Sequence, residues 1–74
     1  MSLLPHISGR QVVAAMERIG YEFDHERGSH MVLRQAEPPN RRLTVPDHSE
    51  IPKGTLRAII REAGLSVEEF SNLL

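Results

Sequence analysis

A histidine and a group of arginines in the middle of this 74-residue chain have the chemistry needed to cut a phosphodiester bond. Imidazole side chains such as that of His30 exchange protons near neutral pH, because the unperturbed pKa of imidazole is about 6.5. Guanidinium groups bind phosphate through two parallel hydrogen bonds, and four arginines lie near this histidine in the sequence: Arg27, Arg34, Arg41 and Arg42. In RNA, a base takes the proton of the 2′-hydroxyl, that oxygen attacks the adjacent phosphorus, and cations stabilise the developing negative charge. This chemistry needs no metal, and DNA, which lacks the hydroxyl, would resist it.

These residues also have simpler interpretations. A single histidine on a strand is more often a surface or hydrogen-bonded structural residue, and arginines more often form a solvated face than a phosphate clamp. A metal site built from His25, His30 and His48 is a further alternative. The chain has no cysteine, however, and no pair of histidines four residues apart on a predicted helix. We therefore expect no metal and no other cofactor.

The predicted helices follow from capping signals and from apolar residues at helical spacing. Ser8 and Gln11 have the spacing of a capping box, and Gly20 is suited to end the helix that follows, from about 9 to 19. Its apolar stripe is Val12, Ala15, Met16 and Ile19. A second helix starts near Pro52 and ends at Gly64, with the stripe Leu56, Ile59, Ile60 and Ala63. A second capping box at Ser66 opens a short last helix that carries Phe70, Leu73 and Leu74.

Between the helices the hydrophobic period changes to two, which is typical of strands. In the first strand, Tyr21 and Phe23 alternate with acidic residues that we expect to face water: Glu22, Asp24 and Glu26. The second strand covers 30–34, with Met31 and Leu33 toward the core and His30 and Arg34 on the opposite face. The third strand covers 41–45 and adds Arg42 to that opposite face, with Arg27 and Arg41 nearby at strand ends.

The predicted fold class is therefore α+β, in the order α-β-β-β-α-α. Short connections favour a three-stranded antiparallel sheet, with the helices packed on one face and the other face left open. At 74 residues the chain has room for one domain, residues 1–74. The predicted catalytic surface is the open face of the sheet.

Composition limits the classes of function that remain. The net charge is −1, which argues against tight non-specific binding along a nucleic-acid backbone. The basic character is local, because residues 27–45 carry four arginines and one glutamate. The absence of cysteine excludes disulfides and thiol chemistry. No apolar run is long enough to span a bilayer and the N-terminus does not have the pattern of a secretory signal, so we expect a cytoplasmic protein with no membrane partner.

Several short motifs, in order and at the right spacing, resemble the HicA toxin family. They are Gly28-Ser29-His30, Val45-Pro46-Asp47-His48, Lys53-Gly54-Thr55-Leu56, Ala63-Gly64-Leu65 and Glu68-Glu69-Phe70. The likeness extends from the helix at Ser8 to the end of the chain. It implies a fold similar to the double-stranded-RNA-binding domain, which agrees with the element order derived above. It also implies an mRNA interferase of a type II toxin–antitoxin pair, neutralised by a HicB-type antitoxin that covers the active surface.

The resemblance assigns roles by position. The family's catalytic histidine falls on His30, and Gly28 and Ser29 lie in the turn that presents it. Ser29 either hydrogen-bonds a phosphate or caps the turn. His48 is either a second acid/base group or an anchor for its loop, and Lys53 either reaches phosphate from the start of its helix or is solvated.

We therefore predict an endoribonuclease that cleaves mRNA and inhibits translation. His30 is its general acid/base, and the candidate RNA-binding residues are Arg27, Ser29, Arg34, Arg41, Arg42 and Lys53. The predicted partners are mRNA and a HicB-type antitoxin, with no membrane and no small-molecule cofactor. Members of the family are often strongly basic, and this chain is not. The low net charge is compatible with one alternative, a degenerate toxin retained as a partner for its antitoxin. A separate alternative is an RNA-binding module without catalysis.

Overall fold

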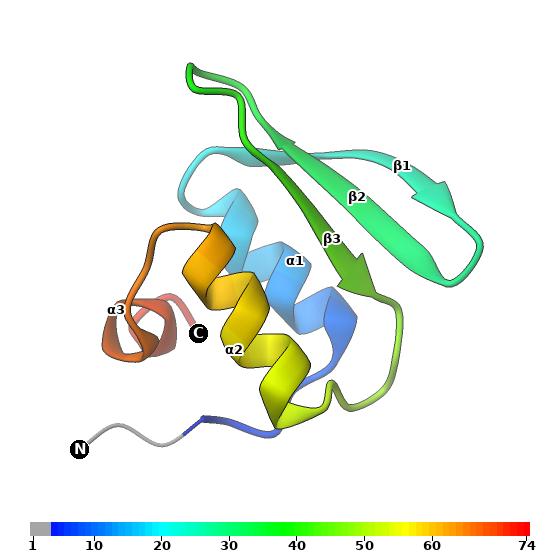
Figure 1. The fold of residues 1–74 in the computed structure, drawn as a ribbon, viewed down its shortest axis with the longest axis vertical. Coiled ribbons are helices and arrows are strands. Elements are labelled where there is room, and N and C mark those ends of the chain that lie inside the picture. Colours follow the sequence, from blue (N-terminus) through cyan, green and yellow to red (C-terminus); the bar gives the residue numbers. More distant parts are fainter. Residues whose placement is uncertain (1–3) are drawn as a thin grey trace.

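A computed structural model describes residues 4–74 and has two layers, a twisted sheet and a group of helices (Figure 1). The elements are α1 (Gly9–Glu17), β1 (Tyr21–Arg27), β2 (His30–Gln35), β3 (Arg42–Pro46), α2 (Lys53–Glu62) and α3 (Val67–Ser71). The strands form one antiparallel sheet in the order β1-β2-β3. The helices pack on one face of this sheet, which confirms the predicted α+β class and element order.

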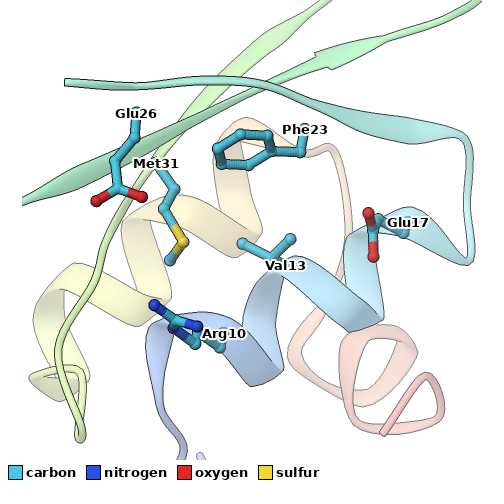
Figure 2. Close-up of a pocket in the computed structure, with 6 residues that line it drawn as sticks. All are labelled: Arg10, Val13, Glu17, Phe23, Glu26 and Met31. Carbon is cyan, nitrogen blue, oxygen red and sulfur yellow. The ribbon is translucent and has the colours of Figure 1, made fainter.

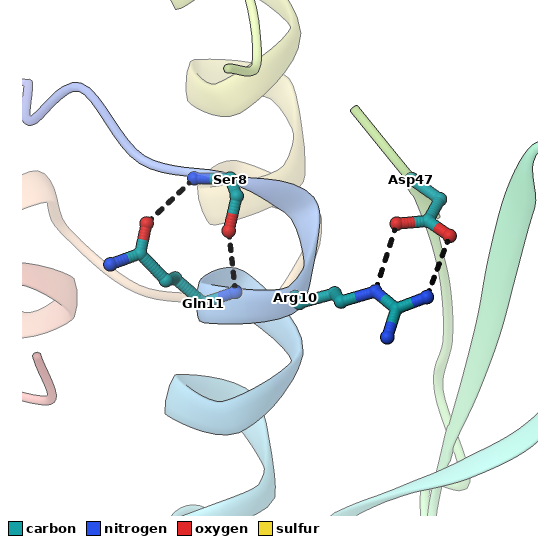
Figure 3. A network of polar contacts seen from close by, with 4 residues as sticks. All are labelled: Ser8, Arg10, Gln11 and Asp47. Carbon is teal, nitrogen blue, oxygen red and sulfur yellow. Dashed lines mark hydrogen bonds and ion pairs between the residues drawn. The ribbon is translucent and has the colours of Figure 1, made fainter. Parts of the chain in front are cut away.

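Both predicted capping boxes are present. The Ser8 hydroxyl accepts a hydrogen bond from the Gln11 backbone N–H, and the Gln11 side chain accepts one from the Ser8 N–H, as Figure 3 shows. Ser66 and Glu69 repeat this arrangement at α3. These bonds satisfy N–H groups that have no partner within the helix, so each helix begins at a defined residue. The first helix ends at Glu17 rather than 19, which leaves Ile19, a predicted core residue, 37% exposed.

One apolar core joins the two layers. The sheet contributes alternate residues of β2 and β3, together with Tyr21 at the start of β1. The helices α1 and α2 contribute the apolar stripes that their helical spacing predicted, apart from Ile19. The buried residues from these elements and α3 are Val12, Ala15, Met16, Tyr21, Met31, Leu33, Leu43, Val45, Leu56, Ile59, Ile60 and Phe70. Apart from the hydroxyl of Tyr21, no polar or charged side-chain group between residues 4 and 74 belongs to a buried residue. All the charged groups of this part of the chain therefore lie at the surface.

A β-bulge in β1 changes which side chains face the core. Phe23 pairs with Leu33 and His25 with Val32, so Asp24 is an extra residue in this strand. The predicted alternation is therefore wrong beyond Phe23. His25 faces the open side, and Glu26, which pairs with the buried Met31, faces the helices. The prediction failed because an added residue shifts every later side chain to the other face.

The segment between β3 and α2 packs against the start of α1. The Gly9 N–H donates to the His48 carbonyl at 2.9 Å, and the Ile51 N–H donates to the Ile7 carbonyl at 2.9 Å. Gly9 is itself buried, and a Cβ there would overlap the carbonyl oxygen of Pro46. Close backbone packing therefore fixes the end of β3, and β3 closes at Pro46, one residue later than predicted.

Candidate functional site on the open face of the sheet

His30 lies on the open face as the first residue of β2. Its direct neighbours across the sheet are Arg27 on β1 and Pro46 on β3. The side chain is exposed and is not packed among the leucine and isoleucine side chains of the core. Gly28 and Ser29 form a two-residue turn, and the φ of 58° at Gly28 is a left-handed conformation that glycine adopts without strain. The turn and the two neighbouring strands thus fix the backbone from which the imidazole projects.

Asp47, the residue after β3, and Arg10 in α1 hold this turn in place. The Asp47 N–H donates to the Ser29 carbonyl at 2.7 Å. The Asp47 carboxylate accepts hydrogen bonds from Arg10 Nε at 3.3 Å and Arg10 Nη2 at 3.4 Å (Figure 3). The hydrogen bond to Asp47 raises the pKa of Arg10 above its usual value, so the guanidinium stays charged. Through Asp47, the first turn of α1 is connected to the residue before His30.

Three of the four predicted phosphate-binding arginines share the open face with His30. Arg27 lies directly opposite His30, and Arg34 lies directly opposite Arg42. All three side chains are exposed, as phosphate binding requires. Arg34 Nη2 is 3.7 Å from the Asp24 carboxylate, which partly offsets the repulsion between the two facing guanidinium groups. The sheet therefore brings a histidine and three guanidinium groups onto one surface.

Arg41 has a different environment. Its guanidinium lies beside Gly64, at the C-terminal end of α2, on the helix side of the molecule. Burial raises the pKa of the Tyr21 hydroxyl, and the positive charge of Arg41 partly opposes that rise. A cation at a helix C-terminus interacts favourably with the helix dipole. Arg41 therefore does not join the other arginines, and its position is that of a structural contact.

The remaining predicted residues lie at three separate places. Ser29 is exposed in the turn next to His30. His48 follows β3, and its backbone carbonyl, rather than its ring, holds the start of α1. No hydrogen bond to the His48 ring is formed by any residue from 4 to 74. Lys53 is the first residue of α2, and its side chain is exposed. Because α2 belongs to the helix layer (Figure 1), Lys53 is not part of the sheet surface.

Sequence reasoning missed a polar pair on the open face, Asp24 and His25. The Nδ1 atom of His25 is 2.9 Å from Asp24 Oδ2, and the two side chains are 45% and 35% exposed, respectively. The hydrogen bond from His25 lowers the pKa of Asp24, against an opposing effect of desolvation, and Arg34 and Arg42 lower it further. Asp24 is thus ionised at neutral pH. The adjacent positions 24 and 25 gave no signal of this pair, because regular alternation would put them on opposite faces.

A groove lies on the other side of β1, between this strand and α1. It has a volume of about 310 Å³, and its apolar lining is formed by Val13, Phe23 and Met31, with charged residues at its rim (Figure 2). Phe23 is 47% exposed here, although the alternating pattern predicted it as part of the core face. The groove is separated by the sheet from His30, so it does not contribute to the site on the open face.

Within residues 4–74, no three histidine or carboxylate side chains are grouped closely enough to hold a metal ion. No helix in the same range has the length and apolar character needed to cross a membrane.

Fold and site together define a small α+β protein that presents histidine and arginine side chains on the uncovered face of its sheet. The family model described as the HicA toxin of bacterial toxin-antitoxin systems matches residues 9–65, which is most of the chain. The chain therefore belongs to the HicA toxin family, as its motifs predicted. Its α-β-β-β-α-α order agrees with the double-stranded-RNA-binding-domain-like fold of that family. The search of curated proteins found no match.

Proposed function

We propose that this toxin is an mRNA interferase in which His30 acts as the general acid/base. It cleaves mRNA in the cytoplasm and so inhibits translation, and a HicB-type antitoxin neutralises it by covering the open face of the sheet. The observation that carries the proposal is the position of His30: an exposed imidazole at a fixed turn, with Arg27 directly opposite on the neighbouring strand. Family membership supports the toxin role, and this geometry supports the proposed chemistry.

The proposed reaction uses the 2′-hydroxyl of the RNA as the nucleophile. His30 takes the hydroxyl proton, O2′ forms a bond to phosphorus, and the bond from phosphorus to O5′ breaks. Negative charge develops on the phosphoryl oxygens, and Arg27, the residue directly opposite His30 on β1, stabilises it. Arg34 and Arg42 are placed to bind a neighbouring phosphate. No step of this route requires a metal ion or another cofactor.

Purified protein and an RNA substrate with single-stranded regions test the proposal. We expect cleavage of RNA but not of the matching DNA, and a fall in rate of about 10²–10⁴-fold for His30→Ala, the usual contribution of general acid–base catalysis. His6→Ala is the matched control, because His6 is also exposed and lies beside a carboxylate, Glu50, at 3.4 Å, away from the sheet. If His30→Ala cleaves as fast as the wild type, the assignment of His30 is wrong.

A specific feature favours a second candidate, a toxin that binds RNA or its antitoxin without cleaving. The open face carries carboxylates as well as arginines: Arg34 is close to Asp24 and directly opposite Glu22. These acids weaken the attraction of the surface for phosphate. RNA binding without His30-dependent strand cleavage would support the binding module. Normal growth of cells that express the chain without an antitoxin would support a degenerate toxin.

A further inference from the structure

The proposed reaction needs two proton transfers, and His30 accounts for one of them. The leaving O5′ must gain a proton when its bond to phosphorus breaks, because an alkoxide is a poor leaving group at neutral pH. In-line displacement places the attacking and leaving oxygens on opposite sides of phosphorus. The second group must therefore face the same surface as His30, separated from it by a phosphate and a hydrogen bond of about 2.6–3.2 Å on each side.

His25 faces the same surface as His30 and lies at a suitable distance along the sheet for this role. It pairs with Val32, and Val32 lies two residues along β2 from His30, so the two imidazoles are diagonal neighbours on one face. The backbones of such diagonal residues are typically about 7–8 Å apart, so two side chains that project from them into solvent have room for a phosphate between their rings. Arg27 completes the same face between the hairpin turn and His25. The bulge at Asp24 produces this arrangement, and bulges frequently redirect a side chain beside an active site.

The contact with Asp24 orients the His25 ring for proton donation. The Nδ1–H donates to Asp24 Oδ2 at 2.9 Å, which leaves Nε2 free to act on a substrate. The carboxylate also compensates the positive charge of a ring that carries two protons. The other charged or titratable groups on this face are Glu22 and Arg27 on β1, His30 and Arg34 on β2, and Arg42 on β3. Arg34 also contacts Asp24, at 3.7 Å, and so holds the carboxylate from the other strand.

The other histidine considered for this role has a less suitable position. His48 lies two residues beyond Pro46, outside the strand, and its backbone is used to hold α1. Its ring is not oriented by a partner among residues 4–74. Arginine does not replace histidine here, because its guanidinium group stays protonated in proteins.

We propose that His25, oriented by Asp24, is the second proton-transfer group of this toxin and acts as the general acid opposite His30 as the base. This rests on the proposed function. His30 gains the proton of the 2′-hydroxyl as O2′ bonds to phosphorus, and His25 gives its proton to O5′ as the bond from phosphorus to O5′ breaks. The products are a 2′,3′-cyclic phosphate and a free 5′-hydroxyl. Solvent then returns each ring to its starting state. His25 is a catalytic residue in this scheme, and Asp24 is a positioning residue.

The test compares two substrates cut at the same linkage. One is ordinary RNA, and in the other sulfur replaces the bridging 5′ oxygen, so that the leaving group departs without a proton. We expect His25→Ala to cut ordinary RNA about 10²-fold more slowly or worse, and to cut the sulfur substrate at close to the wild-type rate. We expect His30→Ala to lose activity on both substrates, and His6→Ala to keep wild-type activity on both. His25→Gln, which keeps a side-chain donor for Asp24, separates proton transfer from structure and should behave as His25→Ala does.

Asp24→Asn tests positioning with the same pair of substrates and with the pH profile. We expect a smaller loss of rate on ordinary RNA, recovery on the sulfur substrate, and a displaced limb of the pH–rate profile for the general acid. Wild-type protein that does not cleave RNA refutes the proposed function itself. Wild-type cleavage that depends on His30 but is unchanged in His25→Ala refutes only the role of His25. A defect that the sulfur substrate repairs in His48→Ala, instead of His25→Ala, likewise overturns it.

Discussion

Replacing Gly9 by alanine should destabilise this protein, although alanine is the better helix former. A Cβ at position 9 would overlap the Pro46 carbonyl oxygen, which belongs to backbone and cannot rotate away. The Gly9 N–H also donates to the His48 carbonyl at 2.9 Å. To accept the methyl group, α1 must move away from the end of β3, and Pro46 is the cross-strand neighbour of His30. The substitution therefore disturbs both the packing and the site.

The magnitude follows from opposing contributions to the free energy of unfolding. Overpacking costs about 1–3 kcal/mol, and loss of the hydrogen bond to His48 costs about 1 kcal/mol. The gain in helix propensity from glycine to alanine is about 1 kcal/mol. The expected net loss is therefore about 1–3 kcal/mol. A domain of this size has a total stability of roughly 4–11 kcal/mol, so the loss is a large fraction of it.

Urea unfolding of the purified variants measures this difference. With a dependence of about 1 kcal/mol per molar urea, the midpoint for Gly9→Ala should fall by about 1–3 M. Gly54→Ala is the matched control. Gly54 lies in α2, and no atom from outside its own helix backbone lies within 4 Å of an added Cβ. We therefore expect the free energy of unfolding to rise by about 0.5–1 kcal/mol and the urea midpoint to rise with it. A Gly9→Ala protein as stable as the wild type or more stable would refute the packing argument.

Two further predictions concern ionisable side chains. The hydrogen bond from His25, with the charges of Arg34 and Arg42, lowers the pKa of Asp24 below its ordinary value of 3.8. The ionised Asp24 carboxylate therefore stabilises the folded state fully above pH 3.8, and this stabilisation is lost as the pH falls through the lowered pKa. Asp24→Asn should therefore be less stable than the wild type at neutral pH but equal to it in strong acid. Urea unfolding at the two pH values measures this difference, and equal stability at neutral pH would contradict the prediction. Tyr21→Phe should raise the stability by up to about 1 kcal/mol, because the buried Tyr21 hydroxyl has no hydrogen-bond partner in the described part of the chain. A lower melting temperature for Tyr21→Phe would show that the hydroxyl has a favourable contact.

The helices and their caps could be predicted from the sequence because their signals are local. A capping box spans four residues, and the apolar stripe of α2 repeats within one helix, so no distant contact is needed to recognise either. The open face at His30, Arg34 and Arg42 was also predictable, since β2 and residues 42–45 of β3 alternate regularly. The roles assigned to these three residues remain predictions.

The rest depended on contacts between segments that are distant in sequence. Arg41 carries the same charge as Arg42, and only the packing of β3 against α2 directs it to Gly64. The exposure of Phe23 follows from the distance between β1 and α1, which leaves a groove rather than a filled core. Nothing in the order of residues 21–27 marks Asp24 as the bulged position, because a bulge is defined by the partner strand.

That bulge also explains how a chain with a net charge of −1 carries a basic surface at its candidate site. Regular pairing from Phe23 onward would put His25 opposite Met31, toward the helices, and Glu26 opposite His30. With one extra residue in β1, Arg27 takes the place opposite His30, and Glu26 turns to the rim of the groove on the other side. A carboxylate beside His30 would repel a phosphate, whereas a guanidinium binds one. The net charge of the chain therefore says little about RNA binding here, because a single backbone irregularity decides which charges surround the imidazole.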